Sequence, residues 1–220
     1  MRGNRRVLHG ASLDLAPGYR VALTGRSGCG KTTFLRVLCG LLQPDSGRVT
    51  LDGRDLFSDG TSTSRHEFRP WPAVTLVFQE LALLPTLNAR DNCTLGLDSG
   101  ASSDYMHDLA RSLEVEHCLH RRVHELSQGE RQRIAIIRGL VRLPRYVLLD
   151  EPTSALDLES SLLLAETLCK VAKEQGTAIL VVTHDLTFAK ACAMRILSLT
   201  TGTISAEVPS PHAEREAGLG

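Results

Sequence analysis

Residues 25–32 carry residue types that are suited to binding phosphate. Their sequence is GRSGCGKT, in which a lysine and a threonine directly follow the last glycine. Glycines allow successive backbone N–H groups to turn towards phosphate oxygens, and the N-terminus of a following helix adds positive partial charge. Lys31 could bridge the β- and γ-phosphates, and the Thr32 hydroxyl could bind Mg²⁺. An ordinary glycine-rich turn is the alternative, but it does not explain why lysine and threonine are in register.

Two adjacent carboxylates, Asp150 and Glu151, follow the apolar run VLL. A phosphoryl-transfer site needs an acidic residue at the end of a buried strand next to the phosphate-binding segment, where it can hold Mg²⁺. Asp150 meets this requirement. Glu151 could orient a water molecule for attack on the γ-phosphate, or it could be a helix N-terminal charge that interacts with the helix dipole. Beside a phosphate-binding loop, the catalytic interpretation is favoured.

Strand-like and helix-like segments alternate along the chain. The short apolar segments 21–24, 73–78, 146–150 and 178–184 predict buried strands, and 34–42, 103–114, 127–142 and 158–176 predict helices. This alternation predicts an α/β fold with a parallel sheet covered on both faces. The segments 48–56 and 195–207 predict hairpins that turn at Asp52-Gly53 and Thr201-Gly202. We expect a mobile loop over 58–72 and a disordered tail over 209–220.

Composition is that of a globular protein without a global electrostatic field. The 25 basic and 25 acidic side chains cancel, so no nucleic-acid partner is expected. The arginines at 131, 133 and 138 have helical spacing and suggest a solvated helix face. The six cysteines form no disulfide-like or zinc-like pattern, which predicts free thiols in a reducing cytosol. Because no apolar run approaches about 20 residues, we expect neither a membrane span nor an export signal.

The order of the motifs resembles that of the nucleotide-binding domain of ATP-binding cassette (ABC) transporters. This resemblance covers nearly the whole chain and includes LSQGE at 126–130, which is similar to the family signature, and SALD at 154–157, which is similar to the family's D-loop. It implies a P-loop NTPase (RecA-like) core with a small antiparallel β subdomain and an inserted helical subdomain. We expect one domain over 1–220, with the core at about 1–80 and 131–208 and the helical subdomain at about 81–130.

The resemblance assigns a role to each matching residue. Glu151, His184 and Gln79 correspond to the catalytic glutamate, the switch histidine and the Q-loop glutamine, and Thr32, Gln79 and Asp150 are the expected Mg²⁺ ligands. Taken singly, Gln79 and His184 could each be a polar residue at a strand end. The residues expected to bind ATP are Gly25, Arg26, Ser27, Gly28, Cys29, Gly30, Lys31, Thr32, Thr33, Ser127, Gly129 and Asp157.

Two positions depart from the family pattern. The commonest signature has glycine and glutamine where this chain has Gln128 and Glu130, and Glu130 places an anion near a phosphate site. The family usually has an aromatic residue upstream of the first strand that stacks on adenine, and Tyr19 is not positioned to do so. Either adenine is bound weakly and the phosphates provide most of the affinity for ATP, or the sequence lacks a strand that precedes its first residue.

The resemblance implies an ATPase subunit that drives a membrane transporter. Its expected partners are transmembrane permease subunits and a second copy of itself or a paralogue, at the cytoplasmic face of the cell membrane. Parts of the chain look closest to ATPases of polar amino-acid importers, and others to ATPases of lipoprotein release or macrolide export. The alternative is a non-transport cassette ATPase of DNA repair or translation, but the chain has neither the coiled-coil insertion nor the second cassette that such proteins usually contain.

Overall fold

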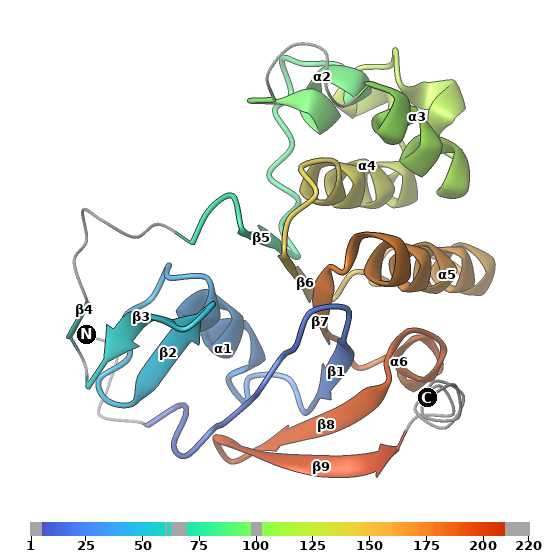
Figure 1. Cartoon of the computed structure of the whole chain (residues 1–220). Helices are drawn as coiled ribbons and strands as arrows, with labels where there is room; N and C mark the ends of the chain where they lie inside the picture. The colour runs from blue at the N-terminus through green and yellow to red at the C-terminus, as the bar shows by residue number, and fades with distance from the viewer. Residues whose placement is uncertain (1–5, 60, 63–69, 98–102, 210–220) are drawn as a thin grey trace.

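The computed structural model describes residues 6–59, 61–62, 70–97 and 103–209. It confirms the predicted α/β class, with a six-stranded sheet, a separate three-stranded sheet and helices on both faces of the larger sheet (Figure 1). Most of the predicted loop at 58–72 and the tail from 210 lie outside the described residues. Within these two segments, residues 61–62 form a short strand and Pro209 ends another, so neither prediction holds over its whole length.

The larger sheet has the strand order β5-β6-β7-β1-β8-β9, and all neighbouring strands are parallel except β8 and β9. Its strands are β1 Arg20–Thr24, β5 Val74–Val77, β6 Tyr146–Asp150, β7 Ala178–Val182, β8 Arg195–Thr200 and β9 Thr203–Pro209. The predicted hairpin is the antiparallel β8–β9 pair, which turns at Thr201 and Gly202. The central strands are short apolar runs because both of their faces are buried.

Alternate side chains of the central strands enter two separate cores. In β6, Val147 and Leu149 join the core under the longer helices, whereas Leu148 joins the core on the opposite face. The first core is closed by α4 Gln128–Leu140 and α5 Leu158–Gln175, which ends at Gly176 in the left-handed conformation. The second is closed by α1 Lys31–Leu38. This alternation follows from the two-residue period of a strand.

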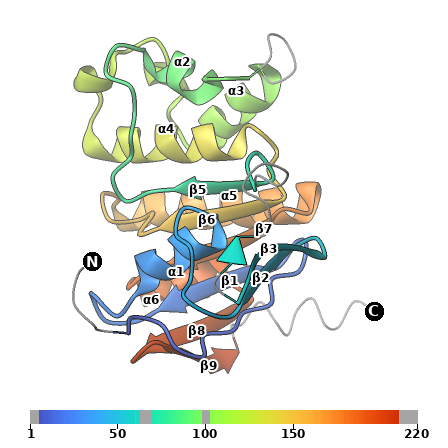
Figure 2. The ribbon, with the colours of Figure 1, turned by 90° about the vertical axis from the view of Figure 1, so that its left-hand side faces the viewer.

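A group of helices lies beyond the β5 edge of the sheet (Figures 1 and 2). It contains α2 Ala89–Thr94, α3 Ser103–Ser112 and two 3₁₀ turns, η1 Glu116–Cys118 and η2 Val123–Glu125, packed against α4. A further helix, α6 Leu186–Cys192, packs against α5. The sequence reading did not identify α2 or α6, because each has too few residues to show a periodic pattern.

The small sheet contains β2 Arg48–Leu51, β3 Arg54–Ser58 and β4 Thr61–Ser62. Asp52 and Gly53 both have positive φ angles at the β2–β3 turn, as the Asp-Gly pair predicted. The Tyr146 hydroxyl donates to Asp52 Oδ1 at 3.0 Å, and Arg145 pairs with Asp52 Oδ2 at 2.6 Å. These bonds tie the turn to the start of β6.

The arginines of α4 do not form the predicted solvated face. Arg131 and Arg133 donate to the carbonyls of His124 and Leu113, and Arg138 donates to those of Leu81 and Ala82. All three are half-buried. They are structural hydrogen-bond donors that join α4 to the preceding loops.

The six cysteines are all free thiols, as predicted. Among the described helices, none combines the length and apolar character needed to cross a membrane.

Candidate nucleotide-binding site

Four loops meet at one edge of the sheet because β5, β6, β7 and β1 are adjacent and parallel. The carboxyl ends of parallel strands lie at the same edge, which is where ligands bind in open α/β sheets. The phosphate loop follows β1, Gln79 follows β5 and His184 follows β7, while Asp150 is the last residue of β6. Four predicted site segments far apart in the sequence are thereby brought together.

The phosphate loop fits tightly against the rest of the chain. A Cβ atom at Gly25 would lie 2.6 Å from the Leu199 carbonyl oxygen, and one at Gly30, where φ is +110°, would lie 2.8 Å from Val7. Only glycine fits both positions. No side chain caps the N-terminus of α1, which leaves its first N–H groups available to an anion.

Lys31 and Thr32 begin α1 and point in different directions. The Lys31 ammonium donates to the carbonyls of Gly25 at 2.8 Å and Arg26 at 3.2 Å, so it folds back over the loop. The Thr32 hydroxyl donates to Asp150 Oδ2 at 2.7 Å. Thr32 and Asp150, two residues predicted to share a cation, are therefore in direct contact.

Asp150 is buried at the end of β6, and burial raises the pKa of its carboxyl above the usual value. The neighbouring Glu151 raises this pKa further, whereas the Thr32 hydrogen bond and the Lys31 charge lower it. A buried carboxylate is most stable with a positive partner. The hydroxyl and carboxylate oxygens, together with the Gln79 amide in the same pocket, are hard oxygen donors, which fit Mg²⁺.

Glu151 and His184 contact each other directly. His184 Nδ1 lies 2.8 Å from Glu151 Oε2, and the His184 backbone N–H donates to the same oxygen at 3.3 Å. The Glu151 side chain is 13% exposed, whereas that of His184 is 75% exposed. The carboxylate is thus held at the pocket by a residue that can still move.

These groups line one open pocket of about 600 Å³. Its wall contains Gly25, Ser27, Gly28, Gly30, Lys31, Thr32, Thr33, Gln79, Asp150, Glu151, Ser154 and His184, together with Val7. Sequence reasoning missed Val7. The backbone N–H of His9 donates to Gly202 O at 2.8 Å, which holds this first segment on the β8–β9 turn beside the loop. The apolar pair Val7-Leu8 was the available signal, but its position depends on a tertiary contact.

Five predicted ATP-binding residues do not line this pocket. Arg26 and Cys29 belong to the phosphate loop itself, whereas Ser127, Gly129 and Asp157 lie elsewhere in the chain. Ser127 caps α4, and Asp157 caps α5 by accepting the Ser160 N–H at 2.8 Å. Hydrogen bonds from Ser160 lower the pKa of the Asp157 carboxyl. A Cβ atom at Gly129 would lie 3.2 Å from the Ala155 carbonyl oxygen, so the signature and the D-loop of one chain are in contact.

Glu130 is already engaged within its own chain. Its Oε2 accepts the Ser127 N–H at 2.7 Å, and Ser127 Oγ accepts the Glu130 N–H at 3.2 Å, which forms a capping box. His117 and Arg121 also lie within 4 Å of Oε1. Burial opposes ionisation of Glu130, but these hydrogen bonds and charges outweigh it and lower the pKa.

The fold and this pocket define a nucleotide-binding ATPase of the P-loop class. Comparison with known proteins is more specific, because the ABC transporter family matches residues 8–154. The chain belongs to this family.

Relatives with established functions serve different transporters. The chain is 37% identical to an aliphatic sulfonates import ATP-binding protein of Rhizobium johnstonii over 96% of its length and 74% of the relative's. It is 38% identical to a lipoprotein-releasing system ATP-binding protein of Rhodopirellula baltica, covering 83% of this chain and 81% of the relative. A spermidine/putrescine import ATP-binding protein of Chromobacterium violaceum is also 38% identical, but the chain spans only 55% of its length.

Solved structures support the same fold. An ATP-binding cassette in a dimeric post-hydrolysis state, bound to ADP and Pi, superposes with a TM-score of 0.81 at 30% identity, covering 94% of this chain and 93% of the cassette. A bacterial Atm1-family ABC exporter with ATP bound gives a TM-score of 0.78 at 29% identity and matches 99% of this chain and 38% of the exporter. The chain is therefore an ATPase domain of the ABC transporter type.

Proposed function

We propose that this chain hydrolyses ATP as half of a head-to-tail dimer and that dimer closure drives a membrane transporter. One observation carries the proposal. The phosphate loop, Asp150, Glu151 and His184 share a pocket, whereas the signature residues Ser127 and Gly129 lie outside it. A site that needs both sets is completed by a second chain, either another copy or a paralogue.

Different residues of the pocket bind the phosphates and the Mg²⁺ ion of the bound nucleotide. Backbone N–H groups from Gly25 to Thr33 bind the phosphate oxygens, and Lys31 leaves the Gly25 and Arg26 carbonyls to pair with phosphate. Thr32, Asp150 and Gln79 would hold Mg²⁺, which neutralises phosphate charge when it is bound. Arg26 and Cys29 contribute as part of the loop backbone.

Glu151 and His184 act on the terminal phosphate. Glu151 accepts a hydrogen bond from the attacking water and positions it, because its carboxylate lies in the pocket beside Asp150. His184, now paired with Glu151 at 2.8 Å, is mobile enough to donate to the γ-phosphate. The facing chain contributes Ser127 and Gly129 to the same phosphate and Asp157 to the interface.

The permease contact is assigned to the segment after β5. Leu84, in the loop after β5, and Leu95, directly after α2, are exposed by 42% and 40%. Arg138 holds the carbonyls of Leu81 and Ala82 in the same loop as Leu84. Apolar side chains displayed on a fixed loop suit a helix of a membrane subunit. With this contact, we propose that the chain works at the cytoplasmic face of the cell membrane. The relatives serve sulfonate import, polyamine import and lipoprotein release, so the cargo follows from the permease.

A Glu151→Gln variant tests the proposal. Glutamine keeps the size of the side chain but removes the acceptor that positions water, so ATP should stay bound and hydrolysis should fall by at least about 100-fold. With MgATP the variant should sediment as a dimer, and without nucleotide it should be mainly a monomer.

Glu166→Gln is the matched control. Glu166 is exposed on α5 and outside the pocket, so this variant should hydrolyse ATP at the wild-type rate and show no lasting dimer. If Glu151→Gln stays monomeric under saturating MgATP, or turns over ATP normally, the proposal is wrong.

A further inference from the structure

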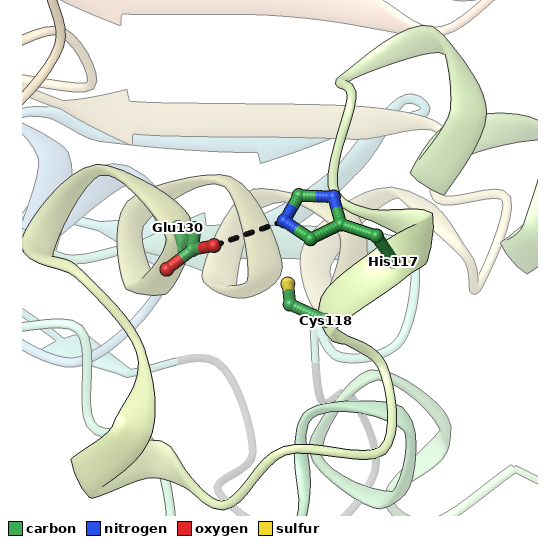
Figure 3. A group of neighbouring side chains, drawn as sticks. All are labelled: His117, Cys118 and Glu130. Atoms are coloured by element: carbon green, nitrogen blue, oxygen red, sulfur yellow. Dashed lines mark hydrogen bonds and ion pairs between the residues drawn. The ribbon is translucent and has the colours of Figure 1, made fainter.

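Three side chains of types that bind metals meet beside the start of α4. His117 and Cys118 come from η1, and Glu130 comes from the first turn of α4 (Figure 3). One ligand atom from each residue lies within 4.8 Å of the other two. None of the three lines the nucleotide pocket, so the proposed ATPase mechanism gives this cluster no task.

We propose that His117, Cys118 and Glu130 form a binding site for Zn²⁺ or a similar divalent transition metal. An imidazole nitrogen, a thiolate sulfur and a carboxylate oxygen are the ligand types of zinc, whereas Mg²⁺ prefers oxygen alone. Three protein ligands leave the fourth tetrahedral position for water.

The distances are compatible with such a site. Zinc–ligand distances of about 2.0–2.3 Å in a tetrahedron place neighbouring ligand atoms about 3–4 Å apart. His117 Nε2 and Glu130 Oε1 are already 3.2 Å apart. The Cys118 sulfur lies within 4.8 Å of a ring nitrogen of His117 and of a carboxylate oxygen of Glu130, so a small side-chain rotation is enough to complete the set.

Binding has two costs, which are the loss of the Cys118 proton and the displacement of Arg121. The buried Cys118 thiol donates to Val115 O at 3.1 Å and must lose its proton to solvent when the metal binds. Arg121, 3.8 Å from Glu130, must turn away, and it is free to do so because its side chain is 51% exposed. His117 is 58% exposed, which gives the ion a path to the sulfur.

The same part of the chain contains a natural comparison. His107 Nδ1 lies 3.1 Å from Glu116 Oε1, almost the same spacing as in the cluster, but among the described residues no cysteine sulfur joins this pair within 4.8 Å. If a histidine and a carboxylate were sufficient, both places would bind metal equally. The proposal requires that metal binds at His117 and Glu130 but not at His107 and Glu116, because only the first pair has the sulfur of Cys118 beside it.

Glu130 gives the site its position in the molecule. One of its carboxylate oxygens faces His117, and the other accepts the N–H of Ser127, the residue proposed to contact ATP in the facing chain. A bound cation would therefore contact the last residue of the signature and lie one side chain away from Ser127.

The test uses Co²⁺ as a spectroscopic substitute for Zn²⁺ on the full chain, without nucleotide. We expect one equivalent to produce a thiolate-to-cobalt charge-transfer band that Zn²⁺ removes. Cys118→Ser should abolish the band, and His117→Gln should weaken Zn²⁺ binding by at least about tenfold. A cation held by Asp150, Glu151 or His184 has no thiolate ligand and gives no such band.

Cys93→Ala and His107→Gln are the controls. Cys93 is a second buried thiol in the same helical region, and His107 belongs to the pair described above, so both variants should keep the band. His117 is exposed, and its replacement leaves the core intact even if Cys118→Ser does not fold. The proposal is overturned if the folded wild type gives no band, or if the band or its affinity survives the His117 substitution. Because this readout does not involve ATP, its failure is distinct from failure of the proposed function.

Discussion

Glu151 has a backbone φ of +50°, in the left-handed region that disfavours residues with a Cβ atom. Its N–H donates to Val182 O at 2.8 Å, so the conformation is fixed by the neighbouring strand β7. The same hydrogen bond places the carboxylate beside His184. The backbone at this position therefore serves the proposed chemistry at a cost in stability.

This strain can be measured by comparing two truncations of the same side chain. Glu151→Gly should be more stable than Glu151→Ala by about 1 kcal/mol, because glycine adopts positive φ without penalty. Urea unfolding gives the difference, and both variants should lack ATPase activity. Glu159 in the first turn of α5 is the control. There the order should reverse, with alanine more stable than glycine by about 1 kcal/mol. Equal stability of the two Glu151 variants would contradict the strain argument.

Most residues of the candidate pocket could be predicted because they belong to short sequence motifs with characteristic residue types and spacing. Lys31 and Thr32 follow a glycine loop, and Asp150 ends an apolar run, so each is recognisable locally. Val7 was not predicted because its place depends on a contact with the β8–β9 turn, nearly 200 residues along the chain. The contact between Glu151 and His184 likewise depends on β6 and β7 being neighbours.

At the scale of elements, α4 approaches the sheet closely through one small residue. A Cβ atom at Gly139 would lie 2.8 Å from Val77 Cγ2 and 3.4 Å from Thr75 Cγ2, both on β5. The sequence predicted α4 and β5 as separate elements from their periodicity. Their close packing was not predictable, because it requires the two faces to be matched.

We predict that Gly139→Ala destabilises the protein by about 1–2 kcal/mol, since overpacking outweighs the gain of about 1 kcal/mol in helix propensity. Val77→Ala alone leaves a cavity and should also be destabilising. Combined, the two changes should cost less than their sum, because the new methyl group fills the space that valine vacates. Thermal unfolding of the four proteins measures this coupling. Strict additivity would show that the two residues are not in contact.

The arginines of α4 show a second limit of prediction at this scale. Helical spacing correctly placed Arg131, Arg133 and Arg138 on one helix, but it suggested that solvent surrounds them. Each instead donates to a carbonyl of another loop. The spacing of charged residues predicts that they lie on a helix. Whether they contact solvent or another segment depends on the tertiary structure.

At the scale of the whole molecule, the phosphate loop and the signature of one chain lie in separate places. In the proposed head-to-tail dimer, each of the two sites would take its phosphate loop from one chain and its signature from the other. A chain that is defective only in Lys31 and a chain that is defective only in Ser127 would then complement each other. Their mixed dimer contains one doubly defective site and one intact site.

Lys31→Ala and Ser127→Asp are suitable partners for this experiment. Aspartate caps α4 as well as serine does, but it places a carboxylate against the phosphate of the facing chain. Each variant alone should be nearly inactive, and Ser127→Asn should lose less activity because it caps without charge. Equal mixing makes half of the dimers mixed, so about a quarter of wild-type ATPase activity should return if the sites act independently.

A mixture no more active than its components would mean that each chain builds its site alone or that both sites must be intact. Sedimentation of Glu151→Gln separates these two cases, because only a site shared between chains needs the dimer to retain ATP.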